Sequence, residues 1–66
     1  MNKIKEFRST AGMTVRALAE KAGVAVGYLS TLENDKNSSV NPTKEVMEKI
    51  ADALNKTVPE VFFAEN

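Results

Sequence analysis

The chain has 66 residues, with nine basic and nine acidic side chains and therefore no net charge. It contains neither cysteine nor histidine, which excludes disulfides, the usual zinc sites and the usual catalytic triads or dyads, so we expect no cofactor, no metal and no enzymatic activity. No segment has the pattern of a signal peptide or of a membrane span, so we expect a cytoplasmic protein that forms a single domain over residues 1–66.

The first predicted helix begins near residue 4. Ile4, Phe7 and Ala11 recur at intervals of three and four residues, as they do along one face of a helix. Gly12 follows as a left-handed C-terminal cap, with Met13 folding back behind it. The pattern therefore predicts one short helix that ends at a glycine.

Two further short helices follow, joined by a second glycine. Thr14 is a good N-cap for the first of them, whose predicted buried stripe is Val15, Leu18, Ala19 and Ala22. Gly23 breaks this helix, because glycine reaches a positive φ without strain. The next helix is predicted from about Val26 to Asn34, with Leu29 and Leu32 pointing inward.

The last third of the chain predicts two more helices after a polar loop at residues 35–42. Thr43 can cap the first, and Asn55 can end it. Its apolar face is Val46, Met47, Ile50, Ala51 and Leu54. Thr57 and Glu60 have the spacing of a capping box at the start of a short fifth helix, which carries Val58, Val61, Phe62 and Phe63. The whole chain is therefore expected to be helical.

The most informative segment is residues 12–24, followed closely by residues 28–33, which together predict two short helices joined by a glycine turn. Two short helices with this turn and with apolar residues spaced for one to dock across the other are typical of a helix-turn-helix. In that motif the second helix is normally presented to the major groove of DNA. The alternative is a plain helical bundle, but a bundle does not need the short glycine turn.

The chain resembles the phage-repressor (Cro-like) helix-turn-helix family over essentially all of its length. The most specific matches are residues 12–14 (GMT), 18–24 (LAEKAGV), 29–33 (LSTLE), 41–43 (NPT) and 49–54 (KIADAL). The resemblance implies an all-α, compact, five-helix lambda-repressor-like DNA-binding domain, with the helix that begins near Ala25 as its recognition helix. It also implies that Arg8 and Glu33 form an ion pair inside the fold.

The resemblance further implies which residues contact DNA. The positions that most often touch base edges in the family match Val26, Gly27, Ser30 and Thr31, and Asn34 is the first amide on the same face. Val26 is suited to a thymine methyl group, whereas Ser30 or Thr31 can hydrogen-bond to several bases. The other expected DNA-binding residues, mainly candidates for phosphate contacts, are Thr14, Arg16, Tyr28, Lys36, Asn37 and Lys44. For Arg16 the alternative is a solvated side chain, and for Tyr28 it is packing between helices.

Two positions depart from the family pattern. Val15 stands where the family often has a glutamine that meets a phosphate or a base. Ala25 stands where the recognition helix usually starts on a serine or threonine, a loss of about 1 kcal/mol in capping. Sequence-specific readout is therefore expected to be modest, with much of the binding left to phosphates and DNA shape.

We predict a sequence-specific transcriptional regulator that binds double-stranded DNA at a dyad operator as a homodimer. No small-molecule ligand and no membrane contact are expected. The dimer interface is predicted at Val58 and Phe63, because Phe62 is expected to turn inward and its neighbour cannot face the same way. The alternative is a protein-interaction module, an antitoxin or anti-repressor that retains the fold.

Charge does not separate these two functions decisively. Residues 1–36, which contain the motif, carry six basic and four acidic side chains, whereas residues 37–66 carry three basic and five acidic side chains. The motif therefore lies in the positive part of the chain, which permits DNA binding. The zero net charge, Val15 and the small number of basic residues around the third helix favour the protein-interaction module.

Overall fold

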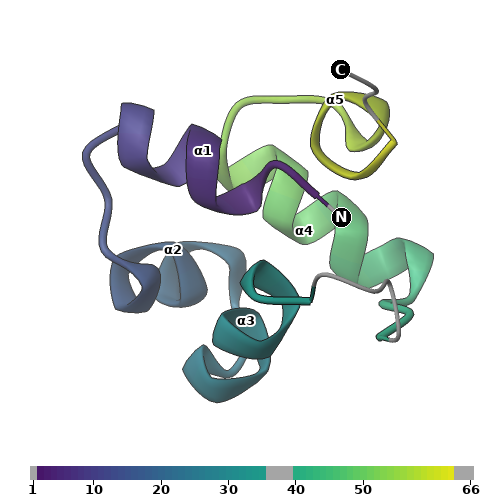
Figure 1. The fold of residues 1–66 in the computed structure, drawn as a ribbon, viewed down its shortest axis with the longest axis horizontal. Helices are drawn as coiled ribbons and strands as arrows, with labels where there is room; N and C mark the ends of the chain where they lie inside the picture. Colours follow the sequence, from purple (N-terminus) through teal and green to yellow (C-terminus); the bar gives the residue numbers. More distant parts are fainter. Residues whose placement is uncertain (1, 36–39, 64–66) are drawn as a thin grey trace.

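The computed structural model describes residues 2–35 and 40–63, and within these ranges it contains five helices and no strand (Figure 1). The helices are α1 (Ile4–Thr10), α2 (Val15–Ala22), α3 (Val26–Glu33), α4 (Lys44–Ala53) and α5 (Val58–Phe62). The predicted all-α, five-helix architecture is confirmed. The helix starts also agree with the capping residues that the sequence indicates.

Three of the helices begin on a threonine whose hydroxyl oxygen accepts a backbone N–H three residues further on. These threonines are Thr14 for α2, Thr43 for α4 and Thr57 for α5. At the start of α5 the Glu60 carboxylate also accepts the backbone N–H of Thr57 at 2.9 Å, which completes the predicted capping box. By contrast, α3 begins at Ala25 with no side-chain cap.

Three helices end on a residue with positive φ. Gly12 follows α1 at φ +73°, Gly23 follows α2 at φ +75°, and Asn55 follows the last turn of α4 at φ +58°. In each case the N–H of the next residue donates to a carbonyl five residues back, as in a Schellman motif. These left-handed residues satisfy the last carbonyls and turn the chain sharply toward its next element.

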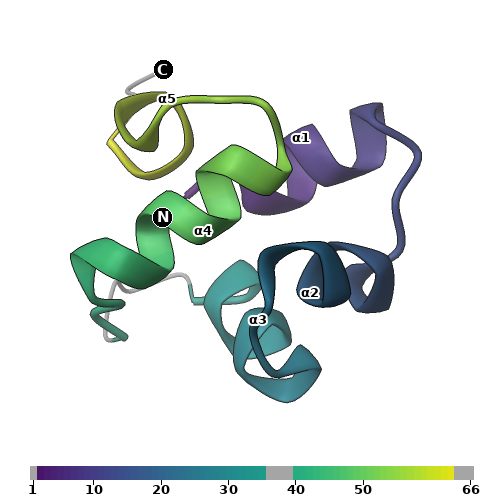
Figure 2. The same ribbon diagram turned by 180° about the vertical axis from the view of Figure 1, so that it is seen from behind.

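The helices enclose one apolar core. α2 packs against both α3 and α4, α4 packs against α5, and α5 packs against α1; Figure 2 shows α4 crossing the molecule above α2 and α3. The Lys3 N–H donates to the Val61 carbonyl at 2.8 Å and joins the beginning of the chain to α5. The buried apolar residues are Ile4, Leu18, Ala19, Ala22, Leu29, Leu32, Ile50, Ala51, Ala53, Leu54 and Val61.

A few residues are more exposed or more buried than the predicted apolar faces indicate. Val15, Met47 and Phe62 are only half-buried, and Phe63 lies just beyond α5 with 63% of its surface exposed. Ala53 is also buried, although it was not predicted on the apolar face of α4. None of the helices in the described ranges is long and apolar enough to cross a membrane.

Candidate nucleic-acid interface

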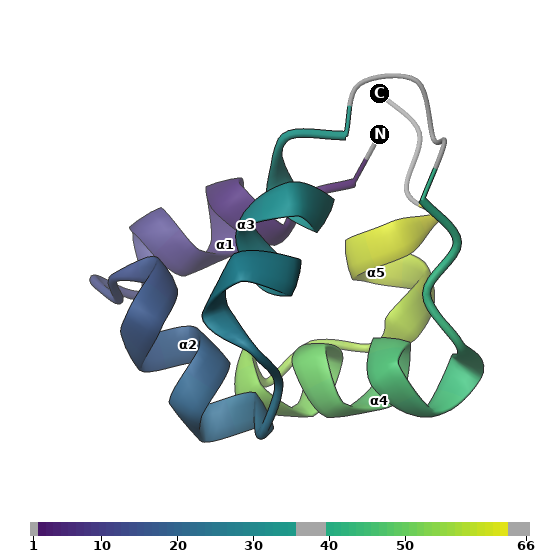
Figure 3. The same cartoon turned by 90° about the horizontal axis from the view of Figure 1, so that it is seen from below.

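The predicted helix-turn-helix is formed by α2, the turn at Gly23, and α3, which Figure 3 shows from below the view of Figure 1. Ala19 and Ala22 are small, buried residues of α2, which packs against both α3 and α4. Leu29 and Leu32 are fully buried on the inner side of α3 and anchor it to the core. The opposite side of α3 is left at the surface.

An ion pair fixes the C-terminal end of α3 to α1. The Arg8 Nε donates to Glu33 Oε2 at 2.8 Å, and Arg8 Nη2 donates to Glu33 Oε1 at 3.0 Å. The third guanidinium nitrogen donates to the Met13 carbonyl at 2.8 Å. The Arg8 and Glu33 side chains are only 15% and 5% exposed, and the hydrogen bonds to Glu33 raise the pKa of Arg8 above its ordinary value. The predicted ion pair is confirmed, and Arg8 is a structural residue.

The outer face of α3 brings together the five residues predicted to face the bases, which are Val26, Gly27, Ser30, Thr31 and Asn34. All of them are exposed except Ser30, which is half-buried. Two of their polar side chains are already engaged within the helix. The Thr31 hydroxyl donates to the Gly27 carbonyl at 3.0 Å, and the Asn34 amide nitrogen donates to the Ser30 carbonyl at 2.9 Å.

Gly27 is not required by the fold. Its φ is not in the left-handed region, and a Cβ placed on it would meet no atom within 4 Å. Glycine inside a helix costs roughly 0.8–1 kcal/mol relative to alanine. The glycine therefore weakens α3 with no compensating contact inside the domain, and it leaves the helix backbone open at the surface.

The predicted phosphate-contacting residues are spread over three helices and the residues that follow α3. Thr14 caps α2 and is exposed, Arg16 is exposed in the first turn of α2, and Lys44 is exposed at the first position of α4. Tyr28 is half-buried and packs against the core, which agrees with the alternative prediction that this side chain packs between helices. Lys36 and Asn37 lie outside the described residues.

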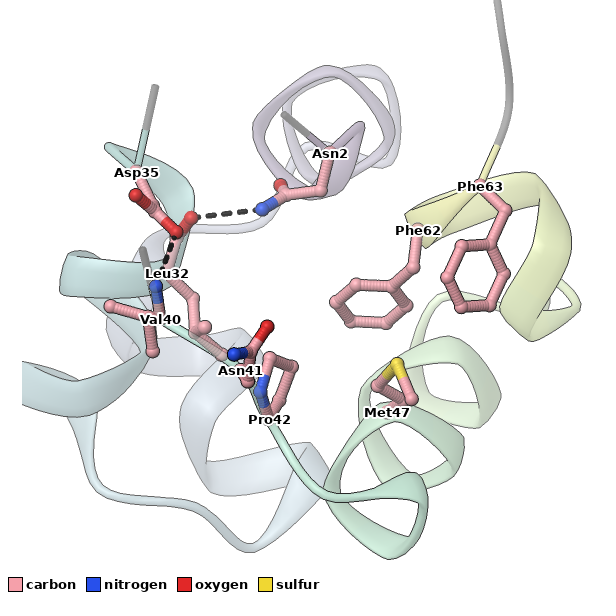
Figure 4. A pocket seen from close by; sticks show the side chains of 9 residues that line it. All are labelled: Asn2, Leu32, Asp35, Val40, Asn41, Pro42, Met47, Phe62 and Phe63. Carbon is pink, nitrogen blue, oxygen red and sulfur yellow. Dashed lines mark hydrogen bonds between the residues drawn. The ribbon is translucent and has the colours of Figure 1, made fainter. Parts of the chain in front are cut away.

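A pocket that the sequence does not predict lies on another side of the molecule, between the end of α3, the start of α4 and the end of α5 (Figure 4). Its volume is about 300 Å³, and its lining is Asn2, Leu32, Asp35, Val40, Asn41, Pro42, Met47, Phe62 and Phe63. Asn2 donates to the Leu32 carbonyl at 2.9 Å, and the Asp35 carboxylate accepts the Val40 N–H at 2.9 Å. Val58, the other predicted interface residue, is half-buried against the core.

The pocket carries no signal of a metal site. Across residues 2–35 and 40–63, no three acidic side chains come close enough together to hold a metal ion. The pocket lining is instead mainly apolar, with Phe63 at its edge exposed to solvent.

Comparison with known proteins identifies a family and similar regulators. A family model described as helix-turn-helix matches residues 4–61. The HTH-type transcriptional regulator SinR of Bacillus subtilis is 41% identical over 56 residues, which are 85% of this chain and 49% of that protein. The chain thus spans about half the length of the curated relatives that it matches first.

Two solved structures resemble the chain in both sequence and fold. A crystal structure of SinR, described as the master regulator for biofilm formation, in complex with DNA has a TM-score of 0.75 at 41% identity, over 85% of this chain and 86% of that one. A structure of a complex between the SinR and SinI proteins has a TM-score of 0.76 at 40% identity, over 86% of this chain and 53% of that one.

Proposed function

The chain belongs to the helix-turn-helix family, of the phage-repressor (Cro-like) type, and from this premise we propose that it is a transcriptional regulator that inserts α3 into the major groove of DNA. The observation that carries the proposal is the asymmetry of α3. Its inner side is locked by Leu29 and Leu32, whereas its outer side exposes small side chains in one row. A similar domain of SinR has been solved in complex with DNA.

In this proposal the protein regulates transcription by occupying a promoter, and it catalyses no reaction. Its site of action is the bacterial cytoplasm, where the chromosome lies. Arg16 and Lys36 are the proposed contacts to flanking phosphates, because neutralising phosphates with arginine or lysine releases counterions from the DNA. Thr14, Tyr28, Asn37 and Lys44 are the remaining proposed backbone contacts.

We further propose that two copies act together on a dyad site. One recognition helix reads only a short half-site, and successive major grooves lie about 34–36 Å apart. The longest extent of the domain is 24 Å, so two copies in contact can span that distance. Phe63, at the edge of the pocket of Figure 4, and Val58, the first residue of α5, are the proposed interface, because a two-fold partner would cover the exposed phenylalanine.

DNA binding is tested by measuring affinity for random duplex DNA over a series of salt concentrations. Two to four basic contacts per subunit predict a log–log salt slope on the order of −4 to −7 for a dimer. Arg16→Ala should make the slope shallower by about two for a dimer. Lys5→Ala, which removes an exposed charge on α1, should leave it unchanged. No affinity for any duplex at low salt would refute the proposal.

The dimer is tested by sedimentation of the free protein over a concentration series, with and without a duplex selected from a random pool. Self-association that Phe63→Ser weakens is the expected result. A strict monomer at high micromolar concentration, both free and on a dyad site, would contradict the proposed dimer but not the proposed DNA binding.

A protein-binding role is the second candidate. It is favoured by the mainly apolar pocket beside Phe63 and by the zero net charge, and a relative of the chain has been solved in complex with another protein. The salt series separates the two candidates, because a module that binds only protein has no salt-sensitive affinity for duplex DNA.

A further inference from the structure

The outer face of α3 has fewer hydrogen-bond donors to offer than its composition suggests. The Thr31 hydroxyl hydrogen is donated to the Gly27 carbonyl, and the Asn34 amide nitrogen already donates to the Ser30 carbonyl. Val26 and Gly27 have no polar side-chain atom. The face also has no arginine, lysine or glutamine, which supply the common bidentate contacts to guanine and adenine.

Apart from the half-buried Ser30 hydroxyl and the Asn34 side chain, this face presents apolar groups. Val26, the first residue of α3, is 39% exposed, and the methyl group of Thr31 belongs to an exposed side chain whose hydroxyl is turned back to its own helix. Gly27 lies between them without a side chain, and the space around its Cα is open. A small apolar group can therefore approach the backbone of α3 between the two side chains.

We propose that α3 recognises its half-site chiefly through the 5-methyl groups of thymines, which contact Val26 and the methyl group of Thr31 across the opening at Gly27. The inference rests on the proposed DNA binding and specifies its chemistry. Among the base edges in the major groove, the thymine methyl is the apolar group that such a surface can bind. The expected half-site is therefore rich in A·T pairs.

The test uses a duplex selected from a random pool by the wild-type protein, prepared once with thymine and once with uracil at every thymine position. Uracil lacks only the 5-methyl group and retains the hydrogen-bonding pattern. Burial of one methyl group is worth about a fourfold change in affinity. The uracil duplex should therefore bind at least about fourfold more weakly. Equal binding of the two duplexes would overturn the inference.

Two substitutions at Thr31 separate its methyl group from its hydroxyl. Thr31→Ser keeps the hydroxyl and removes the methyl, so it should lower affinity for the thymine duplex about fourfold and reduce the discrimination against uracil. Thr31→Val keeps the methyl and removes the hydroxyl, so it should retain affinity within about twofold. The opposite pattern would show that the hydroxyl reads the bases.

Thr10 is a matched control on α1. It is exposed, and its hydroxyl donates to the Glu6 carbonyl at 2.9 Å in the same i to i−4 arrangement. Thr10→Ser and Thr10→Val should leave both duplex affinities unchanged, which accounts for any general effect of these substitutions on a helix. Failure to select any bound duplex would refute the proposed DNA binding itself, whereas binding without discrimination against uracil would refute this inference alone.

Discussion

The two ends of α3 are held in opposite ways. At its C-terminal end, Glu33 pairs with Arg8, Leu32 is fully buried, and the Leu32 carbonyl accepts a hydrogen bond from Asn2. At its N-terminal end, Ala25 provides no cap, and the first turn contains a glycine. The C-terminal end of α3 is therefore fixed by tertiary contacts, whereas its N-terminal end, where the exposed face begins, has no side-chain cap.

This difference shows which forces position the proposed recognition helix. Local capping fixes the starts of α2, α4 and α5, each on a threonine. The start of α3 instead depends on the turn at Gly23 and on burial of Leu29, because no side chain satisfies its first N–H groups. Its first backbone N–H groups are free of side-chain caps, which suits a surface that meets phosphates.

The largest expected effect comes from removing the anchor at the C-terminal end. Arg8→Ala leaves the nearly buried Glu33 carboxylate unpaired and should lower the free energy of unfolding by about 3 kcal/mol. For a domain of this size we expect the melting temperature to fall by at least about 12 °C. Circular dichroism during heating measures it.

The exposed pair of Lys49 and Glu45 on α4 is the control. Their charged atoms are 3.5 Å apart, and the side chains are 48% and 77% exposed, so Lys49→Ala should change the free energy of unfolding by less than about 0.5 kcal/mol. If Arg8→Ala leaves the melting temperature unchanged but weakens DNA binding, Arg8 is a phosphate contact and its structural role is wrong.

A smaller effect of opposite sign should follow from supplying the missing cap at the N-terminal end. Ala25 is exposed and already has the extended backbone of an N-cap, with φ −67° and ψ 137°. Ala25→Ser should therefore raise the free energy of unfolding by about 1 kcal/mol, as measured by urea denaturation. The same change at exposed Ala17, inside α2, should lower it by about 0.5 kcal/mol. Equal effects at both sites would contradict the capping argument.

The start of α5, unlike that of α3, has a complete capping box, and this cap should make the stability of the domain depend on pH. Hydrogen bonds from the backbone and side chain of Thr57 lower the pKa of Glu60 below its ordinary value. A group with a lowered folded-state pKa contributes stability above its unfolded pKa, and this contribution is lost as the pH falls through the folded value. Because Glu60 is fully exposed, the effect is small.

Glu60→Gln keeps the spacing of the capping box but does not titrate. Melting temperatures measured between about pH 6 and pH 2 should therefore fall more steeply for the wild type than for Glu60→Gln. Parallel curves for the two proteins would show that the capping box contributes nothing to acid sensitivity.

Much of the fold follows from local patterns. The starts at Thr14, Thr43 and Thr57 and the left-handed stops at Gly12 and Gly23 are predictable because each depends on a few neighbouring residues. The ion pair between Arg8 and Glu33 was predicted only through the family resemblance. Its partners are 25 residues apart, and spacing alone does not pair distant charges.

The internal hydrogen bonds of the site were not predicted. Thr31 and Asn34 were expected to be available to bases, but a side chain on an exposed helical face can either reach outward or donate to the carbonyl four residues back. The sequence does not decide between these options. The cation–π contact of Lys56 with Phe7, with Nζ 4.8 Å from the ring centroid, likewise depends on tertiary placement.

The central claim is that the outer face of α3 is the surface that binds DNA. Backbone amide chemical shifts of the wild-type protein, followed during titration with a duplex that carries a single half-site and so binds one copy, test it most directly. We predict that the largest changes fall on Val26, Gly27, Ser30 and Thr31 and at the start of α2, with little change around α5. Changes concentrated instead around Val40, Met47 and Phe63 would place the DNA on the pocket and contradict the claim.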